Sequence, residues 1–205
     1  AGLMIALIPI FVTIMSAIIL KEKPKTLQVF FILLSFAGVI TIQLSKVSLN
    51  LNYNILGFIL LLLAALSAAA FNIASRSGSK KHKPFEITYY MTFLGMITFN
   101  SIYLIQLGVQ GNMVDYVQQL LNIDIILRLM YLSVAASIIG FILVNYTLSK
   151  LPAHVSSIYS NFATVVSVIA GYFLLNEQVT IYHMIGGVLI IIGIYGNTRV
   201  NYINK

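Results

Sequence analysis

The residues able to do acid–base or metal chemistry are few in this sequence and lie apart from one another. It contains five Asp and Glu residues, three histidines and no cysteine. The acids all lie in or near predicted loops, and His82, His154 and His183 are separated by long stretches of chain. An enzyme would need convergent acids, a nucleophile beside a base, or metal ligands. The pattern argues against an enzyme, a metal site and a bound cofactor. It favours solvent or membrane–water interface positions for the histidines.

Neutral polar side chains gather in the otherwise apolar run 154–175. Ser157, Asn161 and Thr164 follow the i, i+4, i+7 spacing of one helix face. Ser160 and Thr164 have the i, i+4 spacing on the adjoining face, so the polar residues together form a stripe along the helix. Such a stripe can form the wall of a hydrated cavity that hydrogen-bonds a small solute. It can equally serve helix–helix packing, where hydroxyls allow close approach. For Asn161 we favour the cavity, because a bulky amide is a poor spacer.

Five further polar or aromatic residues are candidates for a substrate pathway. Amides and aromatic rings together can hold the polar and apolar parts of an organic solute. Tyrosines at helix ends also serve as ordinary membrane-interface anchors, and this alternative stays open for all three tyrosines. The candidates are Asn72, Tyr89, Tyr90, Asn145 and Tyr146.

Two acids end similar apolar runs, Glu22 after "IPIFVTIMSAIILK" and Glu177 after "NFATVVSVIAGYFLLN". A carboxylate at such a place can favour the positive N-terminus of the helix that follows, so we predict a structural role. Proton coupling is the alternative. Since Lys21 and Lys23 flank Glu22, we expect this residue to be a surface acid.

The composition shows what must surround these residues. Of the 205 residues, 60% are hydrophobic and only 8% are charged, whereas soluble domains carry about 25% charged residues. The surrounding solvent must therefore be lipid. The net charge of +7 is not a nucleic-acid signature, because the basic residues form short clusters between apolar runs. The chain begins at Ala1 without an initiator Met, and we expect it to be part of a longer protein.

Seven apolar runs are each about long enough to cross a bilayer as a helix. A further segment, 107–124, has Met113, Val117, Leu120 and Leu121 at the spacing of an amphipathic helix on the membrane surface. The predicted spans are 3–20, 27–44, 55–74, 86–106, 125–145, 154–175 and 181–196.

Basic residues set the predicted orientation. If the loops alternate between two sides, ten of the 12 Lys and Arg residues fall on the side of the C-terminus and only Lys46 and Arg128 fall on the other. By the positive-inside rule the C-terminus is then cytoplasmic, and the membrane is a plasma membrane in our interpretation.

An internal repeat relates the two ends of the chain. Moving Glu22 by 155 positions places it on Glu177, and Gly38 then meets Gly193. The matched spans are the first and the sixth, which are five helices apart. Because five is an odd number of membrane crossings, the two copies have opposite orientations across the bilayer. Inverted repeats of this kind are common in secondary transporters. A five-helix unit predicts ten helices in all, with three before Ala1.

The end of the chain, "NYTLSKLPAHVSSIYSNFATVVSVIAGYFLLNEQVTIYHMIGGVLIIIGIY", resembles the end of an EamA domain of the drug/metabolite transporter superfamily. "IPIFVTIMSAIILKEK" followed by "FAGVI" resembles the same region of a first EamA domain, including its proline, Pro9. Two features depart from the family pattern: Thr164 replaces the proline in the second copy, and Lys21 and Asn176 replace the glycine before each acid.

The resemblance implies an all-α integral membrane protein, with seven transmembrane helices here out of ten in two inverted five-helix EamA repeats. The first repeat would end within 1–46, a linker would occupy 47–53, the second repeat 54–197 and a cytoplasmic tail 198–205. For close helix packing we select Pro9, Gly38, Gly140, Gly186, Gly187 and Gly193.

The function that this resemblance implies is the alternating-access transport of a small organic metabolite, such as an amino acid, and most often its export. The implied partners are this solute and the lipid bilayer, with no nucleic acid and an unspecified oligomeric state. The alternatives are a flippase for a lipid-linked sugar and a non-transporting membrane scaffold.

Overall fold

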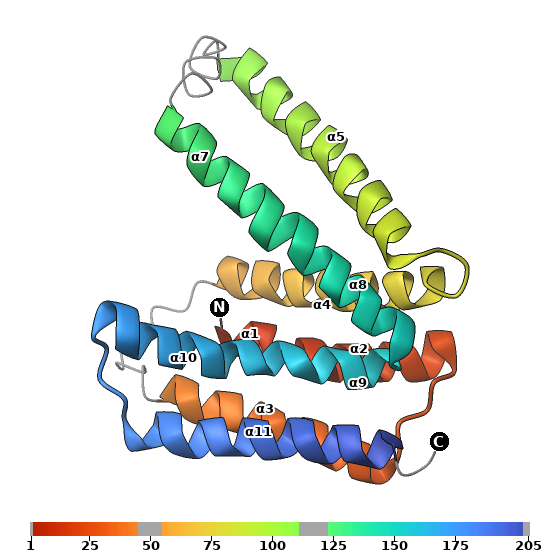
Figure 1. The fold of residues 1–205 in the computed structure, drawn as a ribbon, viewed down its shortest axis with the longest axis vertical. Helices are drawn as coiled ribbons and strands as arrows, with labels where there is room; N and C mark the ends of the chain where they lie inside the picture. Colours follow the sequence, from red (N-terminus) through yellow and green to blue (C-terminus); the bar gives the residue numbers. More distant parts are fainter. Residues whose placement is uncertain (1, 45–54, 111–122, 203–205) are drawn as a thin grey trace. The chain divides into compact units, whose positions relative to one another are not determined.

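A computed structural model describes residues 2–44, 55–110 and 123–202, and every regular element in these ranges is helical (Figure 1). The chain divides into two compact units, one formed by residues 1–77 and 151–205 and the other by residues 78–150.

The first unit contains the two ends of the chain. Its helices are α1 (Gly2–Ile5), α2 (Ile8–Met15) with a π-helical turn Ser16–Leu20, α3 (Thr26–Leu44), α4 (Ile55–Gly78), α9 (Ala153–Ile158) with a 3₁₀ turn Tyr159–Asn161, α10 (Phe162–Leu175) and α11 (Ile181–Tyr202). The second unit contains α5 (Pro84–Gln110), α7 (Ile123–Tyr131), a π-helical stretch Leu132–Ile139 and α8 (Gly140–Lys150).

Six helices in the described ranges are long and apolar enough to cross a membrane, one fewer than the sequence predicted. The exception is the run expected at 3–20, where α1 ends at Ile5 and only Ile8–Leu20 continues as a shorter apolar helix. Pro9 explains the interruption, because it has no N–H to donate to a carbonyl of the preceding turn. Its side chain is fully buried.

The other predicted spans are present with longer bounds. Helix α4 continues to Gly78, and α11 continues to Tyr202, into the segment 198–205 that we assigned to a tail. The amphipathic segment 107–124, with Met113, Val117, Leu120 and Leu121, falls largely outside the described residues, as does the linker 47–53.

Helices α3 and α11 form the tightest contact of the first unit and lie side by side in Figure 1. They run antiparallel, because Gly38 late in α3 faces Gly186 early in α11, and Phe31 faces Gly193. A Cβ on Gly38 would lie 2.6 Å from the Gly186 carbonyl oxygen, and one on Gly193 would lie 2.7 Å from the Phe31 carbonyl oxygen. Only glycine permits backbones to approach this closely.

These two contacts are also related by the predicted offset. Gly193 lies 155 positions after Gly38, and Phe31 lies 155 positions before Gly186. Each glycine therefore has its counterpart across the same interface. For Gly140 and Gly187, in contrast, no described atom lies within 4 Å of an added Cβ, so the described residues show no close contact at either position. The close packing that we predicted for these two stays a prediction.

In the second unit, α5 packs on α8 through a buried polar pair. The Asn145 Nδ2 donates to the Thr88 Oγ1 over 2.8 Å, and both side chains are buried. Most apolar side chains of α5 and α7 are exposed, as expected for helices whose solvent is lipid.

Candidate functional site

The most polar cluster of the first unit is built around Glu22. One carboxylate oxygen, Oε1, accepts from the Arg76 Nε over 2.8 Å, and the other, Oε2, accepts from the backbone N–H of Ala153 over 3.0 Å. The side chains of Glu22 and Arg76 are each only 17% exposed. One carboxylate thus joins the C-terminal end of α2 and its π turn, the C-terminal end of α4 and the first residue of α9. We call this place the Glu22 end of the first unit.

A left-handed residue sets the direction of Glu22. Lys21 has φ 58°, which is uncommon for a residue with a side chain, and the Glu22 N–H then donates to the Ser16 carbonyl over 3.1 Å. This turn ends the helix and sends the Glu22 side chain toward α4 and α9.

Glu177 follows an identical backbone turn. Asn176 has φ 52°, and the Glu177 N–H donates to the Gly171 carbonyl over 3.1 Å. Each of these residues lies 155 positions after its counterpart at the Glu22 end. The Glu177 side chain is exposed, whereas that of Glu22 is largely buried. We call this place the Glu177 end.

The two ends lie at opposite extremities of one helical rod. Helix α9, its 3₁₀ turn and α10 run from Ala153 to Leu175 over 23 residues, which corresponds to about 35 Å. Glu22 binds the first residue of this rod, and Glu177 comes two residues after its last. Figure 1 shows the α2–α3 and α10–α11 connections on opposite sides of the bundle.

We predicted that Glu22 stabilises the N-terminus of the helix that follows it, but its partner is another helix. The carboxylate does not face α3, the helix that follows it, but the N-terminus of α9, 131 positions away. The expectation of a surface acid is also wrong, since Glu22 is held in a mostly buried ion pair with Arg76. The flanking Lys21 and Lys23 are exposed.

A pocket of about 320 Å³ opens at the Glu22 end. His154 is one of its lining residues, is only 3% exposed, and neither of its ring nitrogens has a hydrogen-bond partner among the described residues. His154 lies at the end of its helix, as predicted from the sequence, but its ring is buried between helices and not exposed. The lining consists of Glu22, Lys23, Lys25, Gln28, Pro152, His154, Val200 and Asn201.

The polar stripe of the 154–175 run is divided between two environments. Asn161 is 2% exposed and donates from Nδ2 to the Ser35 Oγ of α3 over 3.0 Å, which ties the rod to α3. Ser157 is also buried, whereas Ser160 is exposed and Thr164 is half-buried. The hydroxyls of Ser157 and Ser160 bond to carbonyls of the preceding turn. In the described part of the chain Asn161 thus serves packing, contrary to the cavity that we favoured.

The other pathway candidates lie on three helices. The Asn72 Nδ2 donates to the Ala68 carbonyl within α4, and Asn145 is buried against Thr88. Tyr89, Tyr90 and Tyr146 are each more than half exposed.

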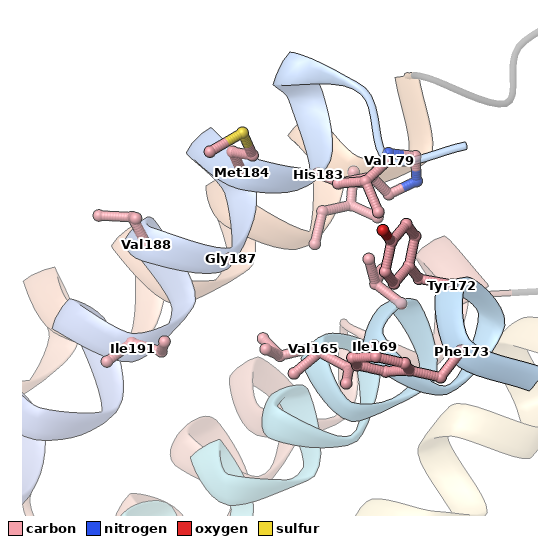
Figure 2. A pocket seen from close by; sticks show the side chains of 12 residues that line it. Val165, Ile169, Tyr172, Phe173, Val179, His183, Met184, Gly187, Val188 and Ile191 are labelled. Carbon is pink, nitrogen blue, oxygen red and sulfur yellow. The ribbon is translucent and has the colours of Figure 1, made fainter. Parts of the chain in front are cut away.

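A second pocket, of about 330 Å³, lies along α10 and α11 and is almost entirely apolar (Figure 2). Figure 2 shows Tyr172 and His183 at one end and aliphatic side chains such as Val188 and Ile191 along the rest. The His183 Nδ1 is already engaged by Thr180, with the backbone N–H 3.1 Å away. The pocket offers few polar groups to an organic solute, so it does not compete with the Glu22 end as a functional site.

The sequence did not identify Arg76, Ala153 or Ser35 as partners in these sites. Arg76 was visible only as a basic residue near the end of a span, and its partner lies 54 positions away. A backbone N–H such as that of Ala153 carries no sequence signal. Ser35 was one of many small residues in an apolar run.

Comparison with known proteins adds three findings. A profile of the EamA-like transporter family matches residues 55–199. A Bacillus subtilis protein described as the uncharacterized transporter YcxC is 38% identical over 197 residues, which cover 96% of this chain and 63% of that protein. An uncharacterized transporter of Archaeoglobus fulgidus is 28% identical over 195 residues, 95% of this chain and 66% of its own length. The chain therefore spans slightly less than two thirds of the length of these relatives.

Proposed function

Because the chain belongs to the EamA-like transporter family, we propose that the whole protein exports a small organic metabolite, such as an amino acid or a similar compound, by alternating access. It is a multi-pass membrane protein with the transporter-named relatives described above. The proposal places it in the plasma membrane with its C-terminus in the cytoplasm, on the basis of the Lys and Arg bias.

The observation that carries this mechanism is the position of the Glu22 bridge. Glu22 belongs to the proposed first repeat, 1–46, and both of its partners, Arg76 and Ala153, belong to the proposed second repeat, 54–197. A carrier built from two repeats needs a contact between them that closes one face and breaks when that face opens. A mostly buried ion pair with a second hydrogen bond on the same carboxylate fits this task.

The contacts related by the offset of 155 support two oppositely oriented repeats. They include the left-handed turns at Lys21 and Asn176 and the glycine contacts of α3 with α11. The two acids lie at opposite ends of the α9–α10 rod, as inverted copies require. On this basis we propose that the broken segment Gly2–Leu20 is a seventh crossing in a ten-helix arrangement, bent at Pro9.

Some of the pathway candidates keep accessible side chains within their own unit. In the first unit Ser160 is exposed and Thr164 is half-buried, and in the second unit Tyr89, Tyr90 and Tyr146 are exposed. Hydroxyls and aromatic rings of this kind suit a solute with both polar and apolar parts.

Transport is tested with the full-length protein in liposomes, by measuring the flux of candidate amino acids and related metabolites with and without a proton gradient. Alternating access is tested by replacing Lys23 and Pro152 with cysteine, because both line the Glu22-end pocket and these 205 residues contain no other cysteine. A bifunctional methanethiosulfonate reagent across this pair should stop the flux, and a reductant should restore it.

Each single-cysteine variant treated with the same reagent is the control and should keep its flux. Unchanged flux in the cross-linked pair would show that the Glu22 end does not open during transport. No flux for any candidate solute in the unmodified protein would remove the transport proposal itself.

A further inference from the structure

We propose that the pocket at the Glu22 end binds a phosphate group at the membrane surface. This inference goes beyond transport and does not depend on it, because it concerns a binding site at one end of the first unit. It is carried by buried donors without partners and by the charge of the pocket lining.

The first observation is an unsatisfied histidine. His154 is buried, and neither Nδ1 nor Nε2 has a hydrogen-bond partner among the described residues. An imidazole carries at least one N–H near neutral pH, and a buried N–H without an acceptor is costly and rare in native proteins. An acceptor bound beside this N–H would remove its part of the penalty.

A second unsatisfied donor comes from another helix. Asn201, near the end of α11, lines the same pocket, and its buried Nδ2 also lacks a partner within the part of the chain that the structure describes. His154 in α9 and Asn201 in α11 are thus two side chains from different helices that line one pocket and carry a buried donor without a partner. Their N–H groups call for an acceptor.

The charges of the lining favour an anion. Lys23 and Lys25 line the pocket, and neither is ion-paired within the described ranges. The only acid of the lining, Glu22, has one oxygen on Arg76 and the other on the Ala153 N–H. Its charge is thus largely balanced by Arg76, and the two ammonium groups leave the pocket positive.

The number of donors and the volume favour phosphate. Two ammonium groups, an amide and an imidazole provide more N–H donors than a carboxylate can accept with good geometry, whereas a phosphate offers three or more oxygens. The volume of about 320 Å³ is at the lower end of small-ligand pockets, enough for a phosphate with part of what it is attached to. Basic pockets between membrane helices are known to hold anionic lipid headgroups. The phosphate can come from such a lipid or from a soluble phosphate ester.

The test measures thermal stabilisation of the full-length protein by two phosphate sources. One arm compares nanodiscs of pure phosphatidylcholine with nanodiscs that contain phosphatidylglycerol. The other adds glycerol phosphate to the protein in a neutral detergent. We expect at least one source to raise the Tm by several degrees, and the double variant Lys23→Gln and Lys25→Gln to lose most of that increase.

The matched control is the double variant Lys80→Gln and Lys81→Gln, which removes the same charge from an exposed turn in the other unit. It should keep the stabilisation. A loss of equal size in both double variants would mean that only overall surface charge matters and would overturn the proposal. The absence of stabilisation by either source would overturn it as well. Stabilisation by phosphatidylglycerol alone assigns the site to a lipid headgroup, and stabilisation by glycerol phosphate assigns it to a soluble ester.

A single substitution separates binding from folding. His154→Phe fills the same space without an N–H, so it should raise the Tm of the phosphate-free protein and at the same time abolish most of the phosphate-dependent increase. A variant that keeps the full increase would exclude His154 from the site, and the proposal would fail. Because the readout is stability, failure here leaves the flux experiments unaffected.

Discussion

The Glu22 end and the Glu177 end of the first unit share the same backbone turn and differ in the partners of the acid that follows it. At both, a left-handed residue, Lys21 or Asn176, ends a helix, and the next N–H returns to a carbonyl six positions earlier. At one end the acid is held by Arg76 and the Ala153 N–H, while at the other it is exposed.

The turn therefore positions the carboxylate but does not determine its role. The role depends on which helix ends lie opposite. The positions 155 before Arg76 and Ala153 fall before Ala1, so this chain does not include the equivalent partners for Glu177.

The largest effect should come from the shared framework that holds both ends. In Gly186→Ala, the added Cβ would lie 2.5 Å from the Gly38 carbonyl oxygen, so α3 and α11 must separate. We expect a loss of about 3 kcal/mol or a failure to fold. Folded yield and thermal unfolding in detergent measure it.

Gly187→Ala is the matched control for this change. It is the neighbouring residue of the same helix, and no described atom lies within 4 Å of its added Cβ. Alanine also has a higher helix propensity than glycine, so this variant should be as stable as the parent or slightly more stable. Similar losses in both variants would show that the glycine contact is not what holds α3 against α11.

The comparison itself is tested by the same substitution at the two acids. Glu22→Gln removes the charge opposite a mostly buried Arg76, and we expect it to cost about 2 kcal/mol. Glu177→Gln alters an exposed side chain and should change stability by no more than about 0.5 kcal/mol. Thermal unfolding of the two variants in parallel gives the difference. Equal effects would mean that the two ends are engaged alike.

A smaller effect is expected midway along the rod that separates the ends. Asn161→Ala leaves the buried Ser35 hydroxyl without its amide partner, at a cost of about 1–2 kcal/mol. In a double-mutant cycle with Ser35→Ala, the two changes should be coupled by about 1 kcal/mol. Loss of solute flux without loss of stability would instead return Asn161 to the solute pathway.

The smallest effect should come from Gly171, the counterpart of Ser16 at the Glu177 end. A Cβ at Gly171 would lie 2.7 Å from the Glu177 Oε2, which is the far end of a flexible and exposed side chain. The carboxylate can move away, so Gly171→Ala should change stability by no more than about 0.5 kcal/mol. A large loss of stability, measured by thermal unfolding, would show that the Glu177 side chain is held in place.

Much of this architecture could be predicted from the sequence, because lipid restricts the backbone conformations that a membrane-spanning chain can adopt. A run of about 20 apolar residues in lipid must form its backbone hydrogen bonds within itself. The composition therefore predicted both that the spans exist and that they are helical. The exception, at Pro9, depended on whether the helix would continue past a missing N–H, and that depends on the packing around it.

The candidate sites were less predictable, because they depend on partners that sequence spacing does not encode. The i, i+4 rule placed Ser157 and Asn161 on one face but could not say whether that face met α3 or a cavity. Likewise, Gly38 and Gly187 look alike in sequence, and only the neighbouring helix decides which of them needs to be glycine.

Apolar runs of membrane-spanning length and the matching patterns around Glu22 and Glu177 could be read from the amino-acid sequence, because both depend on a few neighbouring residues. The partners of Glu22 and the burial of His154 could not be read in this way. An ion pair over 54 positions and a hydrogen bond over 131 positions form only once the helices have packed.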